Sequence, residues 1–267
     1  MAEVTVMKPS DEGTSSTTER VIRTYLALVS GSSEVGITDL ATATGMSKAV
    51  VHRIIGHFVD YGLAARNPVT RRYSLGPKSF ALAEAVRPKQ VLSTCARPFM
   101  EYLYELTGET ITLTQRVNFH HLYVSQIESP HEIHISVALG TDVPLTVGSC
   151  GLCQLAYLDS ETIDLILRIP RKKYTNATVT DDATIRARLD EIRRDGYSVT
   201  SGERVSLCTS IATPILAGDH NPIGSLGVAC LDSRFPLIDR QLLIQETKRA
   251  AAQIGKKVLA ASHTTLP

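Results

Sequence analysis

The sequence predicts an α+β protein in two parts, and three observations lead to that prediction. Near the N-terminus, apolar residues recur at helical spacing and are followed by a short basic hairpin pattern. From residue 110 onwards, alternating and β-branched stretches mix with helical ones. Positive charge is concentrated in the first part. We therefore expect an N-terminal winged helix-turn-helix, a connector helix, and a C-terminal domain with a mainly antiparallel sheet flanked by helices.

The N-terminal part begins with a polar tail and two short helices. Residues 8–18 are polar, and a disordered tail is expected over residues 1–18. The first helix is expected at Thr18–Val29 and the second at about Ile37–Ala43, with Thr38 as the N-cap of the second. Gly45 then turns the chain into a third helix.

Residues 45–75 carry the clearest pattern for an element that binds a nucleic acid. Ser47 is a good N-cap. The apolar residues after it fall at i, i+3, i+4 and i+7 and so form one buried stripe; they are Val51, Ile54, Ile55 and Phe58. An apolar strand, a turn at Asn67–Pro68 and a returning strand with Arg71 and Arg72 form a basic wing. Such a helix and wing suit the grooves and phosphates of DNA.

The candidate DNA contacts are the polar and small residues beside the stripe and the two wing arginines. Arg53 can bond a guanine edge or a phosphate, although an ion pair with Asp60 is the alternative. Arg71 and Arg72 are adjacent, so on a strand they point to opposite faces and only one enters a groove. His52 contacts a base or phosphate, or is simply solvated. The predicted contacts are Ser47, Lys48, Ala49, His52, Arg53, Arg71 and Arg72.

The charge distribution supports this interpretation although the net charge is only +1. Residues 19–90 contain ten Lys or Arg and five acids, a net charge of +5, which leaves −4 for the remainder. Such asymmetry is typical of a basic binding module joined to a neutral or acidic domain. The sequence has neither a membrane-spanning apolar run nor a signal region, and its five cysteines are an odd number. We expect a cytoplasmic protein without a membrane partner.

The second part follows a helical connector that Pro88 interrupts. The expected boundaries are 1–18 for the tail, 19–78 for the winged helix-turn-helix domain, 79–95 for the connector helix and 96–262 for the C-terminal domain. Strands are expected at 110–117, 122–129, 133–139, 198–201, 210–216 and 223–231. Helices are expected at 151–158, 161–168, 183–195 and 237–259.

Several stretches resemble the IclR family of bacterial transcriptional regulators, from about residue 19 to residue 260. MSKAVVHRII with GLAARNPVTRRYSLG resembles its winged helix, and LTGETITLTQRV and YVSQIESP its first effector-domain strands. VPLTVGSCGLCQLAYL, IRRDGYSVTSGE and SIATPIL resemble its later segments. The resemblance implies a homodimer or homotetramer, a GAF/profilin-like C-terminal domain, and a small-molecule effector that controls binding to double-stranded operator DNA. We expect a repressor rather than an activator.

The predicted effector site departs from the family pattern. The loop Thr146–Cys153 lacks the family's His and Lys, Thr200 stands at its acidic position, Thr209–Ser210 replaces its Arg-Cys pair, and Gly227–Cys230 replaces its Ser-x-Ser-Gly. These positions offer hydroxyls, a thiol and small side chains but no Arg, Lys or His. We expect a mostly apolar effector, aromatic or a ring-bearing acid, larger than a three-carbon acid. Its predicted contacts are Val147, Ser149, Cys150, Thr200, Ser210, Gly227 and Ala229; ordinary loop or strand polarity is the alternative.

Two further functions start from the cysteines. Cys150 and Cys153 form a C-x-x-C, which with Cys208 and Cys230 can bind zinc or sense oxidants. A Cys-dependent enzyme acting through Cys150 or Cys208 is the other alternative, although no base is paired with either. The pair His131–His134 is not a metal motif, since strand alternation separates the two rings at an exposed edge. We expect no enzyme, no metal and no cofactor.

Overall fold

The computed structural model describes residues 16–31, 34–86, 91–218 and 220–264. The chain divides into two compact units, residues 1–89 and 90–267, each with its own hydrophobic core. In the described part of the chain, no helix is both long enough and apolar enough to cross a membrane.

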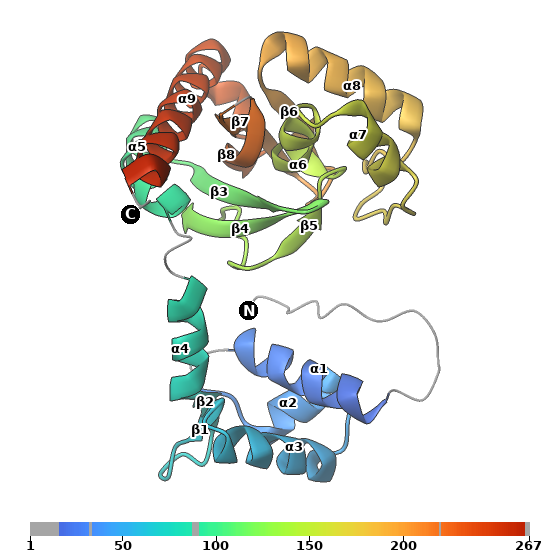
Figure 1. Ribbon diagram of the computed structural model, residues 1–267, viewed down its shortest axis with the longest axis vertical. Helices are drawn as coiled ribbons and strands as arrows, with labels where there is room; N and C mark the ends of the chain where they lie inside the picture. Colours follow the sequence, from blue (N-terminus) through green and yellow to red (C-terminus); the bar gives the residue numbers. More distant parts are fainter. Residues whose placement is uncertain (1–15, 32–33, 87–90, 219, 265–267) are drawn as a thin grey trace. The chain divides into compact units, whose positions relative to one another are not determined.

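The N-terminal unit is a three-helix core with a two-stranded wing (Figure 1). Its elements are α1 (Thr17–Val29), α2 (Ile37–Thr44), α3 (Lys48–Asp60), β1 (Ala64–Arg66), β2 (Tyr73–Leu75) and α4 (Pro77–Val86). The stripe predicted for α3 is buried and packs against Leu28, Leu40 and Tyr73. This burial stabilises the unit, at about 25 cal/mol per Å² of apolar surface removed from water.

One helix start and one helix cap in this unit differ from the predictions. Ser16 Oγ accepts a hydrogen bond from the amide of Glu19 at 3.1 Å, so α1 begins at Thr17. Thr17 and Thr18 therefore belong to a helix rather than to the expected tail, whose residues 1–15 lie outside the described part. The N-cap of α2 is Gly36, not Thr38. The Asp39 carboxylate accepts from the Gly36 amide at 3.1 Å, so the cap lies two residues before the predicted one, while the helix begins at Ile37 as expected.

The C-terminal unit contains one six-stranded antiparallel sheet in the order β5-β4-β3-β8-β7-β6. Its strands are β3 (Thr110–Val117), β4 (His120–Ile127), β5 (Asp142–Pro144), β6 (Ser198–Ser201), β7 (Cys208–Ala217) and β8 (Asn221–Leu231). Its helices are α5 (Val91–Thr107), α6 (Gly148–Leu155), α7 (Ser160–Leu167), α8 (Asp182–Asp195) and α9 (Arg240–Thr264), with a 3₁₀ turn at Phe235–Leu237.

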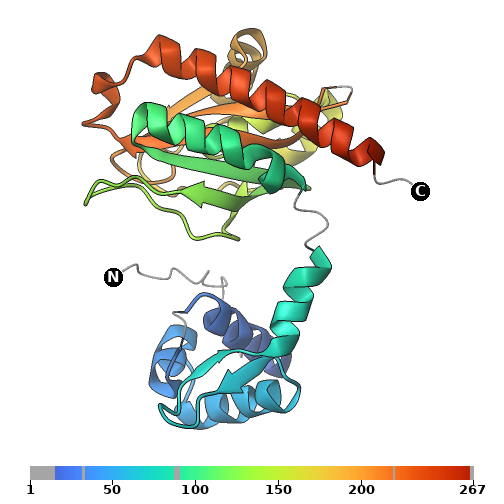
Figure 2. The same cartoon turned by 90° about the vertical axis from the view of Figure 1, so that its left-hand side faces the viewer.

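Helices cover both faces of this sheet (Figures 1 and 2). One core joins α5 and α9 to β3, β7 and β8, and a second core gathers α6, α7 and α8. Along β7 the side chains alternate, with Ile211 and Ile215 in the first core and Ala212 in the second. The predicted α+β class and mainly antiparallel sheet are confirmed.

The strand predicted at 133–139 is wrong, because this segment has no ladder partner and β5 lies beside β4 instead. Side chains take the backbone groups that a ladder would use. Thr110 Oγ1 donates to the carbonyl of Ile135 at 2.6 Å, and the amide of Val137 donates to Gln126 Oε1 at 2.9 Å. Ile135 and Val137 are nevertheless buried. The segment is therefore a cover over the end of the sheet, held by polar contacts.

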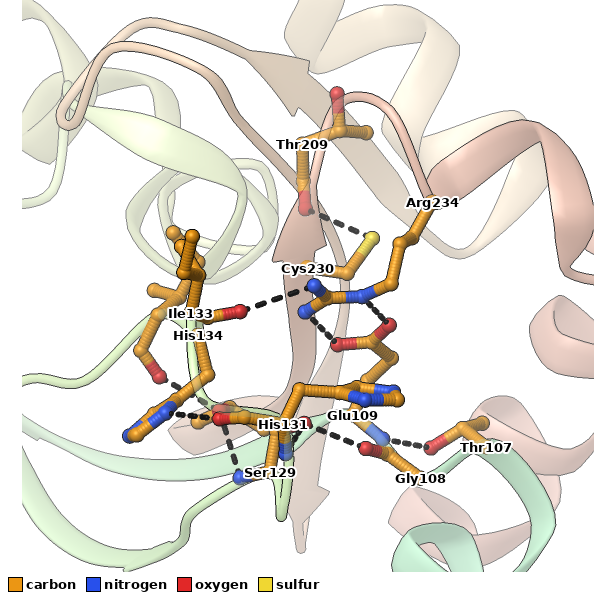
Figure 3. A network of polar contacts seen from close by, with 12 residues as sticks. Thr107, Gly108, Glu109, Ser129, His131, Ile133, His134, Thr209, Cys230 and Arg234 are labelled. Atoms are coloured by element: carbon orange, nitrogen blue, oxygen red, sulfur yellow. Dashed lines mark hydrogen bonds and ion pairs between the residues drawn. The ribbon is translucent and has the colours of Figure 1, made fainter.

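A buried ion pair holds the same segment (Figure 3). Glu109 is only 3% exposed, and its two oxygens lie 2.5 and 2.8 Å from Nε and Nη2 of Arg234. Arg234 Nη1 also donates to the carbonyl of Ile133 at 3.0 Å. Because a buried carboxylate is costly unless it is paired, this bidentate contact fixes the start of β3, the end of β8 and the covering segment together.

Candidate functional site

The exposed face of α3 has the arrangement that the sequence predicted. Ser47 caps the helix by accepting from the amide of Val50 at 3.4 Å, and Lys48, Ala49, His52 and Arg53 are all exposed. The alternative ion pair between Arg53 and Asp60 is not seen among the described residues; Asp60 Oδ2 instead lies 3.9 Å from Nδ1 of His57. Within the described residues, no hydrogen bond or ion pair occupies the Arg53 guanidinium. This side chain is available to a ligand outside the protein.

The two wing arginines do not lie on the returning strand, which corrects the prediction. β2 begins at Tyr73, and Arg71 adopts a left-handed backbone conformation with φ of 57° in the turn before it. Their separation therefore comes from the turn rather than from strand alternation. Arg72 donates to Asp39 Oδ2 at 3.0 Å and to the carbonyl of Glu34 at 3.2 Å. Arg72 thus anchors the wing, whereas Arg71 is exposed at its tip.

The Glu34 carboxylate organises the wing turn. Its two oxygens accept from Asn67 Nδ2 at 2.6 Å and from Thr70 Oγ1 at 2.9 Å. These hydrogen bonds lower the pKa of Glu34 because they favour its charged form. Asn67 Oδ1 in turn accepts from the amide of Val69 at 2.9 Å, which confirms the predicted turn. The wing is therefore set in place before any ligand arrives.

A small cavity in the C-terminal unit gathers most of the predicted effector residues. It has a volume of about 40 Å³. Ser149 donates its amide to Thr200 Oγ1 at 3.0 Å, and its hydroxyl lies 2.7 Å from that of Ser210. The predicted residues that line the cavity are Val147, Ser149, Cys150, Thr200, Ser210 and Ala229.

Gly227 does not line the cavity, and its small size serves another purpose. A Cβ at this position would lie 2.8 Å from Thr112 Oγ1 and 2.9 Å from Cys150 Sγ. The missing side chain therefore makes room for Cys150 rather than for a ligand. At roughly 15 Å³ per water, the cavity holds only a few waters. The predicted space for a large apolar effector is thus not present in this conformation of the pocket.

Arg204 lines the cavity, which contradicts the expectation of a pocket without cations. Its guanidinium carbon lies 5.1 Å from the ring centroid of Tyr123, which also lines the cavity. The neighbouring acid, Glu203, is paired with Arg188 at 2.5 Å. The sequence position of Arg204 indicated this role, because Arg204 lies on the connection between the strands that carry Thr200 and Ser210. A charge on a connection between two site strands is a candidate for the site.

Burial favours the protonated form of the cysteines in and beside the pocket. Burial raises the pKa of Cys150 and, more strongly, that of Cys153; the pKa of Cys208 rises to about 11 for the same reason. α6 begins at Gly148, three residues before the predicted helix, so Ser149 and Cys150 lie in its first turn. Within the described residues, no group of three or more His, Cys, Asp or Glu is arranged to hold a metal ion.

His131 and His134 lie on the segment between β4 and β5 rather than on a strand edge, which corrects the prediction. His134 Nδ1 lies 2.7 Å from the carbonyl of His131, and its Nε2 lies 3.6 Å from Glu128 Oε2. The two rings therefore serve local contacts of the covering segment.

His121 on β4 lies close to the pocket but was not among the residues predicted from the sequence. It is fully buried, and neither ring nitrogen has a hydrogen-bond partner. Its ring meets that of Tyr123 edge-on at 5.4 Å between centroids. Burial, together with the charge of Arg204, lowers the pKa of His121 to about 3. His121 is therefore a neutral ring behind the cation of the pocket.

Comparison with protein families identifies both parts of the chain. Residues 26–68 match the model of the IclR helix-turn-helix domain. Residues 85–256 match the model of the bacterial transcriptional regulator IclR C-terminal domain. The chain belongs to the IclR family. It is a transcriptional regulator of that family, with a DNA-binding helix-turn-helix and a C-terminal ligand-binding domain.

IclR-family relatives match most of the chain. The HTH-type transcriptional regulator BhcR of Paracoccus denitrificans (strain Pd 1222) is 31% identical over 197 residues, 73% of this chain and 71% of that protein. The transcriptional repressor IclR of Escherichia coli (strain K12) is 22% identical over 204 residues, 75% of this chain and 74% of that protein.

Solved IclR-family structures share the fold. The IclR regulator from Alicyclobacillus acidocaldarius has a TM-score of 0.73 and 25% identity, with 91% of this chain and 98% of that chain covered. An IclR homologue from Microbacterium hydrocarbonoxydans, complexed with 4-hydroxybenzoate, has a TM-score of 0.75 and 21% identity, with 92% and 100% covered.

Replacing His121 with Leu should flatten the acid dependence of stability. The unfolded chain binds a proton at this residue below about pH 6.5, whereas the folded chain does not until about pH 3. Between these values the wild type should lose up to about 1.4 kcal/mol of unfolding free energy per pH unit through this group. Urea titrations from pH 7 to pH 4 measure this, with exposed His52→Leu as the control. Equal slopes for wild type and His121→Leu would contradict the assignment.

Proposed function

We propose that this regulator is a repressor that binds operator DNA through α3 and the wing and that responds to a small organic acid. The observation that carries the DNA contact is the exposed guanidinium of Arg53, which has no partner among the described residues, on a helix whose opposite stripe is buried. Arg71 at the wing tip supplies a phosphate contact, and Lys48 adds charge at the start of α3. The repressor of Escherichia coli in the same family supports the sign of regulation.

The effector that best suits the pocket is a monocarboxylate with an apolar body. Arg204 supplies one cation, and Ser149, Thr200 and Ser210 supply hydroxyls near it. Ile135, Val137 and the ring of Tyr123 supply the apolar wall. The 4-hydroxybenzoate bound by the Microbacterium homologue is an acid of this class.

A ring-bearing acid requires the pocket to enlarge beyond its present 40 Å³. Residues 204–207 are the part suited to move, because Leu207 is 70% exposed and Arg204 has no ion pair among the described residues, whereas Glu203 before them is held by Arg188. Effector binding would then favour one of two conformations by no more than its difference in affinity between them.

We further propose at least a homodimer. A single reading helix makes few contacts, whereas two helices read half-sites about 34–36 Å apart. Exposed apolar residues on α1 and α4 support an interface in this unit, and the Tyr25 hydroxyl lies 2.9 Å from that of Ser79, which brings the two helices together. These residues are Ile22, Leu26, Val29, Phe80 and Leu82. Whether dimers pair into tetramers is part of the same test.

The cysteine-based alternatives have less support. A Cys-dependent enzyme needs an activated thiolate, but burial raises the pKa of Cys150 and of Cys208 well above neutral. We propose that these thiols fill space beside the pocket and that the protein has no catalytic activity.

Arg53→Ala should lower the affinity for the native operator by about 1–3 kcal/mol without unfolding the protein, because one base-reading contact is lost. Arg71→Ala should instead weaken binding to all sequences and reduce its salt dependence. Gel-shift titrations at several salt concentrations measure both effects, with Arg97→Ala on α5 as the matched loss of one exposed charge. Unchanged operator affinity for Arg53→Ala would refute the assignment.

Replacing both Ile22 and Leu26 with Glu should convert the dimer into a monomer, because charges would then occupy an apolar interface. Light scattering at micromolar concentration measures the mass. The matched control is Tyr61→Glu, at an exposed aromatic residue outside α1 and α4. A wild-type monomer that still binds its operator tightly would refute the dimer.

The carboxylate class can be tested by thermal shift with 4-hydroxybenzoate and its uncharged analogue 4-hydroxybenzamide. Only the acid should stabilise the wild type, and Arg204→Met should abolish the shift, whereas exposed Arg168→Met should not. Ser149→Trp should fill the pocket and abolish the response to the acid while operator binding persists. Equal shifts with the amide, or a normal response in Arg204→Met, would rule out this assignment of the pocket.

A further inference from the structure

A second hollow in the C-terminal unit shares no residue with the effector pocket. It is an open groove of about 570 Å³ at the far end of β7. β6 pairs with β7 only through residues 209–212, so residues 213–217 of β7 have a strand neighbour on one side only. α9 packs beside this part of β7 (Figure 1). Residues of α9 line the opposite side of the groove. The volume lies in the range of small-molecule sites.

The walls of the groove are mainly apolar. Pro214 and Leu216 come from β7, and Ala252 and Leu259 come from α9. The close approach of the two elements requires Gly255, since a Cβ there would lie 2.1 Å from the carbonyl oxygen of Leu216. Gly255 therefore fixes the distance between α9 and β7 and with it the depth of the groove.

One buried polar group at the groove has no partner within the protein. Thr213 lies between Ile211 and Ile215 on the face of β7 that packs towards α9, and it is only 5% exposed. Its Oγ1 makes no hydrogen bond, although Thr213 lines the groove. Most buried hydroxyls in proteins are paired. An oxygen of a bound molecule would supply the missing acceptor.

The charged residues that line the groove are lysines, and the nearby acid Asp195 is paired with Arg194. Lys248 and Lys256 stand two turns apart on α9, on the side that carries Ala252, and both are exposed. Lys248 donates to the carbonyl of Asp195 at 2.7 Å, whereas no ion pair of Lys256 is present among the described residues. No carboxylate lies among the described residues that line the groove. The rim therefore favours an anion over an apolar floor.

We propose that this groove binds an amphipathic organic monoanion, independently of the effector pocket. The apolar body lies against Pro214, Leu216 and Ala252, the anionic group lies at the lysine rim, and Thr213 donates to an oxygen of the molecule. A second copy of the chain is a poorer occupant, because a two-fold contact through this surface brings two lysine rims together.

Calorimetric titration of the full-length protein with 2-naphthoate tests the proposal, with 2-naphthylmethylamine as the cation of matched shape. The acid should bind once per chain at this site and the amine should not. Ala252→Trp should lower the affinity for 2-naphthoate at least about tenfold, because the new side chain fills the groove. Lys256→Glu should lower the affinity about tenfold, because it reverses the charge. Thr213→Val should lower the affinity for 2-naphthoate about fivefold, because it removes the hydroxyl donor.

The controls separate this site from the effector pocket and from oligomerisation. Gln253→Trp adds the same side chain one residue away from the groove lining and should leave 2-naphthoate binding unchanged. Arg204→Met should also leave this binding event unchanged. Equal binding of the amine, or full binding by both Ala252→Trp and Lys256→Glu, would overturn the proposal. So would a change in molecular mass with Ala252→Trp, because the groove would then be a subunit interface.

Discussion

β7 carries buried side chains on both of its faces, and this constraint shapes the whole C-terminal unit. Ile211 and Ile215 require the cover of α5 and α9, and Ala212 requires that of α6. A sheet with two apolar faces must be covered by two helical layers. Two polar residues of the same strand lie at the margins of these cores: Ser210 at the effector pocket and Thr213 at the groove beside α9.

A carboxylate organises the irregular chain in each unit. Glu34 accepts hydrogen bonds from two residues of the wing turn, which leaves Arg71 exposed. The Glu34 carbonyl also accepts from Arg72, which keeps Arg72 against the body of the unit. Glu109 pairs with Arg234, which also holds the carbonyl of Ile133 in the cover of the pocket. Loops lack ladder bonds, so such contacts between distant residues decide where they lie.

The effector pocket has a polar end whose groups are already hydrogen-bonded to one another, and it has little free space. Gly227 gives its volume to Cys150, and the hydroxyls of Ser149 and Ser210 bond each other. A ligand that hydrogen-bonds Ser149 or Ser210 must therefore replace the hydrogen bond that these two hydroxyls make with each other. Under the proposed function, this requirement ties binding to a change in conformation, as a response to an effector needs. The covering segment and residues 204–207 are parts of the pocket wall that belong to neither a strand nor a helix.

The sequence by itself determined the features that depend on local periodicity. The stripe from Val51 to Phe58 and the cap at Ser47 follow from helical spacing, and β3 and β6 have their predicted bounds. Family resemblance located most of the pocket but could not place Gly227, whose role depends on Cys150.

Tertiary structure alone decided the rest. Residues 133–139 have a strand-like composition, yet Thr110 and Gln126 take their backbone groups, so no ladder forms. Arg72 anchors the wing because Asp39 is folded next to it, and Arg204 joins the pocket because Tyr123 lies beneath it. Each outcome depends on a partner at least ten residues away, and a local pattern carries no information about which distant groups will meet.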